Sequence, residues 1–149
     1  MSLHAYLMDD CTIHVPSGFR DRTQHTLEWQ TSEGDTIALV IQREPAPAGG
    51  APPAFDLQRY TAAQTRDYPR SFAGFHLERD ETRGDDGGFP MCRKAFRWHK
   101  DQDVLYHHQA FVLLGDTIVV LTAAAKAAHR ELVDALLDDA LQSFAARAS

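Results

Sequence analysis

Residues 89–121 constrain the fold of this chain more than any other stretch. Polar connectors at residues 99–103 and 115–116 divide the stretch into three apolar runs of strand length. Short connectors between such runs are typical of an antiparallel meander. The second and third runs carry apolar residues on both faces, whereas a sheet in a soluble domain usually buries one face and exposes the other to water. The second face therefore has to be covered by helices, a second subunit or a ligand.

The other segments predict further strands and two helices. Strand patterns cover residues 5–15, 26–29, 36–43 and 75–77, and helical spacing covers residues 55–68 and 127–146. Asp56 is a candidate helix cap and Pro69 a candidate helix end. The Pro- and Gly-rich residues 44–53 and the acidic residues 80–88 read as surface loops. We therefore expect one α+β domain over residues 1–149, with a mainly antiparallel sheet of six to seven strands and two flanking helices.

Charge and cysteine content exclude some functions. The net charge of −6 argues against a nucleic-acid groove, which needs clustered Lys and Arg. Cys11 and Cys92 belong to no CxxC pair, so we expect free thiols, with a disulfide as the alternative. The sequence shows no signal peptide, no lipoprotein box and no apolar run of about 20 residues. We expect a cytoplasmic protein without stable membrane association of its own.

Catalytic and metal-binding patterns are not found in the sequence. His107 and His108 are adjacent in a strand and therefore point to opposite faces, which makes a shared metal site improbable. The chain contains no HExxH, no GxSxG and no glycine loop ahead of a helix. We expect no catalytic residue, no cofactor and no metal site.

An ordered series of features resembles a known family. It comprises an aromatic-x-Trp unit at Phe96 and Trp98, a polar hairpin, a His-Gln-x-Phe unit at residues 108–111, and a strand reaching Thr122. Upstream, residues 13–16 and the helix at 55–68 match in order and spacing. The chain resembles the DcrB-related family with the Mog1/PsbP-like fold, and within it is most similar to the Eag chaperones of bacterial type VI secretion.

This resemblance implies a binding protein rather than a catalyst. Eag chaperones act as dimers in the cytoplasm and hold the apolar N-terminal transmembrane segments of effectors, often of the PAAR or Rhs type. The implied binding residues on an apolar sheet face are Ala38, Val40, Leu105, His107, Gln109 and Phe111, with Leu27 as a further candidate, and Gln64 joins them from the helix. Gln64 and Gln109 would hydrogen-bond to the bound helices, while His107 stands where an apolar residue would be expected.

Physical considerations favour the same interpretation and leave two alternatives. A transmembrane helix in water exposes about 20 apolar residues, each contributing roughly 1.5–3 kcal/mol on burial. A broad apolar sheet face, opposite one covered by the protein's own helices, could shield it. One alternative is a module of the same fold that binds a soluble protein through a polar face, as Mog1-type regulators do. The other is an enzyme or small-ligand binder, which would need a deep pocket with convergent polar groups.

Overall fold

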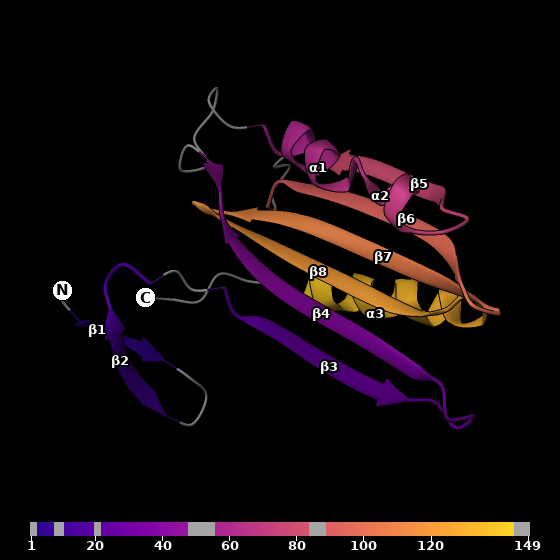
Figure 1. Cartoon of the computed structure of the whole chain (residues 1–149), viewed down its shortest axis with the longest axis horizontal. Helices are drawn as coiled ribbons and strands as arrows, with labels where there is room; N and C mark the ends of the chain where they lie inside the picture. Colours follow the sequence, from indigo (N-terminus) through magenta and orange to yellow (C-terminus); the bar gives the residue numbers. More distant parts are fainter. Residues whose placement is uncertain (1–2, 8–10, 20–21, 48–55, 84–88, 145–149) are drawn as a thin grey trace.

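Six strands form the main sheet. The computed structural model describes residues 3–7, 11–19, 22–47, 56–83 and 89–144 (Figure 1). The strands are β3 (Gln24–Gln30), β4 (Thr36–Pro45), β5 (His76–Arg83), β6 (Met91–Lys100), β7 (Asp103–Leu114) and β8 (Thr117–Lys126). Their order is β3-β4-β8-β7-β6-β5, and all neighbours are antiparallel. The predicted α+β class with a mainly antiparallel sheet is confirmed.

The N-terminal strand prediction was wrong in detail. In place of one strand over residues 5–15, the chain forms β1 (Leu3–Leu7) and β2 (Thr12–Pro16), which pair antiparallel as a separate two-stranded sheet. Pairing satisfies backbone groups that a single strand apart from the main sheet would leave without partners. Figure 1 shows this hairpin beside the main sheet rather than within it.

The central helix is shorter than predicted and is followed by a second one. Helix α1 covers Leu57–Thr65, and the side chain of Asp56 accepts hydrogen bonds from two backbone N–H groups of its first turn, which confirms the predicted cap. Helix α2 covers Tyr68–Ser71, with Pro69 in its first turn. Proline is tolerated there because the first-turn N–H groups have no intrahelical acceptor. Pro69 therefore does not end the helical region.

Two further boundaries differ from the predictions. Strand β5 extends to Arg83, beyond the predicted residues 75–77, although its second half is charged. An edge strand tolerates charges because one of its sides remains in water. The C-terminal helix divides into a 3-10 turn, η2 (Ala127–His129), and α3 (Arg130–Gln142). Some predicted segments extend outside the described residues. These are residues 48–53 of the predicted loop, residues 84–88 of the acidic turn, residue 55 of the first predicted helix and residues 145–146 of the second.

The helices cover opposite faces of the sheet, whereas we expected both on one face. Helix α3 packs on β7 and β8 and contributes the fully buried Val133 and Leu137 to the larger core. Helix α1 packs on β6 and β7 through Leu57. The strand residues of the α3-side core are Ile37, Met91, Ala95, Tyr106, Ala110, Val112, Val119, Leu121, Ala123 and Ala125. Those of the α1-side core are Cys92, Phe111, Ile118 and Val120.

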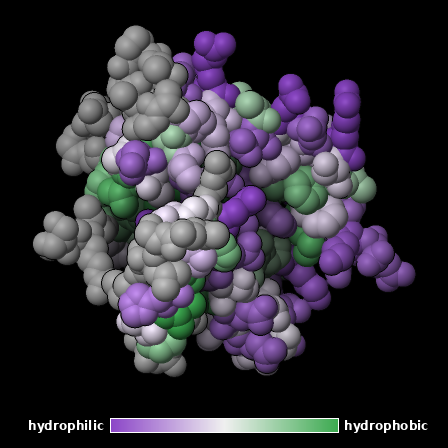
Figure 2. Space-filling model, turned by 60° about the vertical axis from the view of Figure 1, so that its left-hand side comes forward, coloured by the Kyte–Doolittle hydropathy of each residue, from purple (hydrophilic) through white to green (hydrophobic). Residues whose placement is uncertain are grey.

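Apolar side chains also remain at the surface. Figure 2 shows separate hydrophobic patches between hydrophilic residues. The large apolar residues most exposed in the described parts of the chain are Ile13, Phe19, Leu27, Trp29, Leu77 and Leu132.

Candidate functional site

An aromatic cluster joins α2 to strands β6 and β7. Its members are Tyr68, Phe72, Phe75, Phe96, Trp98 and His107. The ring centroids of Phe72 and Trp98 lie 4.9 Å apart, and the rings of Phe96 and His107 are stacked at 5.0 Å. Gly74 has φ +64°, and a Cβ there would approach the His99 ring to 2.4 Å, so this turn requires glycine. The cluster covers the β6–β7 part of the α1 face.

His107 is part of this cluster and has one ring nitrogen engaged. Trp98 Nε1–H donates to His107 Nε2 over 3.1 Å. Burial lowers the pKa of His107 to about 4, so the ring is neutral at pH 7. Because Nε2 accepts a hydrogen bond, the proton of the neutral ring is on Nδ1. His107 therefore offers an N–H donor within a mostly apolar face.

Gln109 lies beside His107 and is held on both sides. Its side-chain oxygen accepts a hydrogen bond from Tyr68 Oη (3.2 Å), and its nitrogen donates to Thr122 Oγ1 (3.3 Å). The residue is only 9% exposed. Burial raises the pKa of Tyr68, so its hydroxyl remains a donor. Gln109 thus connects α2 to β8 across the sheet face.

From His107 and Gln109 toward β4, the same face continues as a half-buried floor. One cross-strand row runs from His107 through Ala124 to Ala38, and a second runs from Gln109 through Thr122 to Val40. Helix α1 packs on β6 and β7, and the side chains beyond them remain half-buried. We call the half-buried set the open floor: Ala38, Val40, Leu105, His107, Thr122 and Ala124.

The structure brings most of the predicted site residues together. Their alternate positions in β4 and β7 place Ala38, Val40, Leu105, His107 and Gln109 on the same face. Gln64 is exposed on α1. Phe111 is only 3% exposed and packs in the core with Leu57.

Phe111 is therefore a core residue in this structure, and its replacement by a charge would disturb the fold. Leu27 lies on the opposite sheet face from the other predicted site residues, because it pairs with Leu39, which packs against the α3-side core. The sequence interpretation missed three contributors, Tyr68, Thr122 and Ala124. Extending the alternation Ile118–Val120 by two more steps along β8 would have found the last two.

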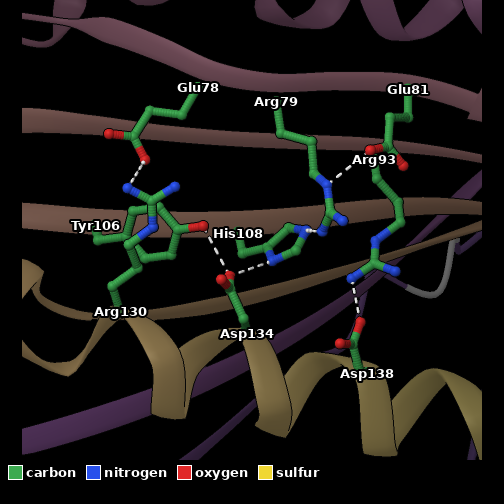
Figure 3. A network of polar contacts seen from close by, with 9 residues as sticks. All are labelled: Glu78, Arg79, Glu81, Arg93, Tyr106, His108, Arg130, Asp134 and Asp138. Carbon is green, nitrogen blue, oxygen red and sulfur yellow. Dashed lines mark hydrogen bonds and ion pairs between the residues drawn. The ribbon is translucent and has the colours of Figure 1, made fainter.

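The α3 face carries a network of paired polar groups (Figure 3). Asp134 Oδ1 accepts hydrogen bonds from Tyr106 Oη (2.7 Å) and from His108 Nδ1 (2.8 Å). Arg79 lies 3.3 Å from the other ring nitrogen of His108. Arg93 pairs with Asp138 at 2.5 Å. The predicted opposite orientation of His107 and His108 is confirmed, since the two rings lie on different faces.

A bulge in β5 contributes to this network. The register of β5 against β6 shifts between Leu77 and Arg79. Glu78 and Arg79 therefore both reach the α3 face, where Glu78 lies 2.8 Å from Arg130. Burial lowers the pKa of His108, although its hydrogen bond to Asp134 acts in the opposite direction. The network attaches α3 to β5, β6 and β7, and several of its residues line an open polar cavity of about 430 Å³.

One group of potential metal ligands occurs in the described residues. The ligand atoms of Glu33, Asp35 and His129 lie within 4.8 Å of one another. Asp35 already interacts with His129 Nε2 at 2.8 Å and with Lys126 Nζ at 3.0 Å. The hydrogen bonds from His129 and then Lys126 lower the pKa of the Asp35 carboxyl. The geometry is that of an ion pair with Lys126 and a hydrogen bond with His129, which fix the β3–β4 turn to the end of β8 and to η2.

A smaller cavity lies between the helices α1 and α2 and the strands β5 and β6. Its volume is about 220 Å³, and its lining includes Phe75, Leu77 and Phe96. Small-molecule sites usually have volumes of about 300–1,000 Å³. This cavity is below that range, whereas the polar cavity beside α3, at about 430 Å³, is within it. The open floor is a sheet face rather than a pocket, which suits an extended partner.

These features define an α+β domain with one sheet face covered by α3 over β7 and β8 and one partly open apolar face. The DcrB family model matches residues 10–143, and the chain therefore belongs to the DcrB family. A comparison with curated protein sequences gives no significant match. Among the described residues, no helix is long and apolar enough to span a bilayer.

Solved structures with low sequence identity share the fold. PA94 from Pseudomonas aeruginosa, a protein of unknown function with a suggested regulatory role, is similar over 99% of both chains, with TM-score 0.77 and 18% identity. Cyanobacterial PsbP from Synechocystis sp. PCC 6803 covers 98% of this chain and 93% of its own, with TM-score 0.57 and 12% identity. LpqN of Mycobacterium tuberculosis, involved in cell envelope biogenesis, covers 92% and 78%, with TM-score 0.50 and 11% identity. The predicted PsbP-like fold is confirmed.

Proposed function

We propose that this protein is a cytoplasmic chaperone or adaptor for type VI secretion effectors of the PAAR and Rhs type. It binds the apolar N-terminal transmembrane segments of the effector and shields them from water until the effector is loaded. The resemblance to Eag chaperones motivates this function. The observation that carries it is the open floor, where apolar and small side chains remain partly exposed in the middle of a sheet.

The composition of the open floor suits a helix. Ala38 and Ala124 are adjacent in neighbouring strands, and small residues let a helix backbone approach closely. The Nδ1–H of His107 can donate to a polar atom of a bound helix. Burying about 20 apolar residues at roughly 1.5–3 kcal/mol each requires a broad surface. A sheet face provides that surface without a deep pocket, and the function requires no catalytic step.

Co-expression tests this function. The N-terminal segment of the effector encoded beside this protein, fused to a soluble reporter, should be soluble with the protein and precipitate without it. A reporter carrying a polar segment of equal length is the control and should be soluble in both cases. Equal precipitation of the apolar fusion with and without the protein would refute the proposal.

A soluble protein partner is the second candidate function. The charged cavity on the α3 face, lined by residues such as Arg79, Arg130 and Asp134, favours it. Binding through those charges should weaken as salt concentration rises, because ions screen exposed charges. Binding of an apolar segment should not weaken in this way. Salt dependence of the captured complex therefore distinguishes the two functions.

A further inference from the structure

The smaller cavity on the α1 face is separate from the open floor. The open floor extends from β7 to β4, whereas this cavity lies at the β5 side of the sheet, between the helices α1 and α2 and the strands β5 and β6. We call it the α2 pocket, and its lining includes Ala62, Tyr68, Phe75, Leu77 and Phe96. It is thus a mainly apolar hollow beside an edge strand.

The aromatic walls of the α2 pocket are held by contacts within the protein. The ring centroids of Phe75 and Phe96 lie 5.2 Å apart. The loop that carries Phe75 is held by two backbone hydrogen bonds. The Phe75 N–H donates to the Phe72 carbonyl oxygen (3.2 Å), and the His99 N–H donates to the Ala73 carbonyl oxygen (2.7 Å). A site formed in advance has a smaller ordering cost when a partner binds.

The volume of the α2 pocket suits one aromatic ring. The pocket measures about 220 Å³, and an apolar cavity of about 150 Å³ is large enough to bind benzene. Leu77 in its lining is 41% exposed, so apolar surface remains open to a partner. Because the volume is below the usual range of small-molecule sites, the pocket suits a single side chain of a larger partner.

The charges at the α2 pocket favour an acidic group beside that ring. Among the described residues that line it, Arg66 and Lys94 are the only charged ones. Each has one acidic neighbour: Asp67 lies 3.8 Å from Arg66, and Asp80 lies 3.4 Å from Lys94. These two carboxylates are 64% and 52% exposed, and exposed pairs contribute little to stability. A carboxylate of a partner can therefore join or replace them at small cost.

We propose that the α2 pocket is an anchor site for a segment of a partner protein in which an aromatic residue stands beside an acidic one. The aromatic ring enters between Phe75, Leu77 and Phe96, and the neighbouring carboxylate pairs with Arg66 and Lys94. Such a segment is polar enough to be soluble. The inference therefore goes beyond the proposed function and does not require a transmembrane segment.

Peptide binding tests the chemistry of the ligand. The probe is acetyl-Gly-Phe-Asp-Gly-amide, titrated into the isotope-labelled full chain and followed by NMR. It should bind about tenfold more tightly than the same peptide with Ala in place of Phe, because loss of an anchoring ring is among the costliest changes at an interface. A peptide with Lys in place of Asp should also bind more weakly, since its ammonium group meets Arg66 and Lys94. Equal binding by either substituted peptide, or no binding of the probe, would overturn the proposal.

A blocking substitution tests the location. Ala62 and Ala63 are both exposed on α1, but only Ala62 lines the α2 pocket. Ala62→Trp should bind the Phe-Asp peptide about tenfold more weakly than wild type, while Ala63→Trp should bind it as wild type does. Circular dichroism checks that both variants are folded. If folded Ala62→Trp binds the peptide as well as Ala63→Trp, the proposed location is overturned.

Charge reversal tests the basic side chains. Arg66→Glu and Arg59→Glu change the net charge equally at exposed positions of the α1 segment, but only Arg66 lines the α2 pocket. Only Arg66→Glu should weaken binding of the Phe-Asp peptide, and equal weakening by both would overturn the role of Arg66. None of these outcomes depends on an apolar helical client. Failure of the proposed function would therefore leave the α2 pocket unaffected, and the reverse also holds.

Discussion

The two faces of the sheet are both apolar, but only the α3 face is covered by a long helix, which packs on β7 and β8. On the α3 face, Val133 and Leu137 are fully buried against the strands, and the polar network attaches the helix at its flank. On the α1 face, the cover consists of short helices and an aromatic cluster over β6 and β7. The open floor beyond them has small side chains such as Ala38 and Ala124.

This difference shows that apolar strand composition does not itself locate a core. What closes a face is a helix of sufficient length, fixed in place by specific contacts. Helix α3 has 13 residues, whereas α1 has nine and α2 four. The α1 face has the shorter cover, and the proposed binding surface lies there.

The largest expected effect tests whether the α3 face is closed. Leu137→Ala should lower the free energy of unfolding by about 2–5 kcal/mol, because the side chain is fully buried and leaves a cavity. Leu132→Ala in the same helix, where Leu132 is 41% exposed, should cost less than about 1 kcal/mol. Urea unfolding measures both. Equal losses would contradict the closed arrangement of this face.

Acid should destabilise the other face through His107. Its pKa is about 4 in the fold against an ordinary value of 6.5, so the unfolded chain binds the proton more readily. The contribution to stability is present above pH 6.5 and is lost as pH falls toward 4, by up to about 3 kcal/mol. His107→Gln keeps an acceptor for Trp98 but does not titrate. Between pH 7 and pH 4.5, the free energy of unfolding of His107→Gln should fall less than that of wild type. An equal fall in the two proteins would contradict the account.

Removing a shared acceptor should weaken the attachment of α3. Asp134→Ala leaves the Tyr106 hydroxyl and the His108 N–H without their carboxylate, at an expected cost of about 1–3 kcal/mol. Asp139→Ala, at an exposed position of the same helix, is the matched control. Both variants gain the same helix propensity, so their difference isolates the network. Thermal unfolding that shifts equally in the two variants would show that the network adds no stability.

The smallest effect concerns the border between cover and open floor. Gln109→Leu loses the hydrogen bonds to Tyr68 and Thr122 and should lower the free energy of unfolding by about 1 kcal/mol. The loss is small because leucine retains part of the packing. Gln64→Leu, on the exposed side of α1, should change the unfolding free energy by less than about 0.5 kcal/mol. If Gln109→Leu changes the free energy of unfolding as little as Gln64→Leu does, the Gln109 amide does not stabilise the contact between α2 and the sheet.

Much of the sheet was predictable because alternation is a local property. The pattern of residues 91–121 placed Phe96 and Trp98 on one face and separated His107 from His108 correctly. The side of each helix was not predictable, since amphipathic helices pack equally well on either apolar face. The bulge at Glu78 and the contact between Tyr68 and Gln109 join distant segments without any local signal. Phe111 was expected on the binding face for the same reason, whereas it is buried in the core.

The most direct test of the central claim is the affinity for an apolar helical peptide of about 20 residues, measured in detergent-free buffer. Ala124→Asp places a charge on the open floor, and Ala128→Asp places the same charge on an exposed residue of η2. The account predicts that wild type and Ala128→Asp bind equally and that Ala124→Asp binds at least tenfold more weakly, a difference of about 1.4 kcal/mol or more. Equal binding by all three proteins, or no binding by the wild type, would contradict it.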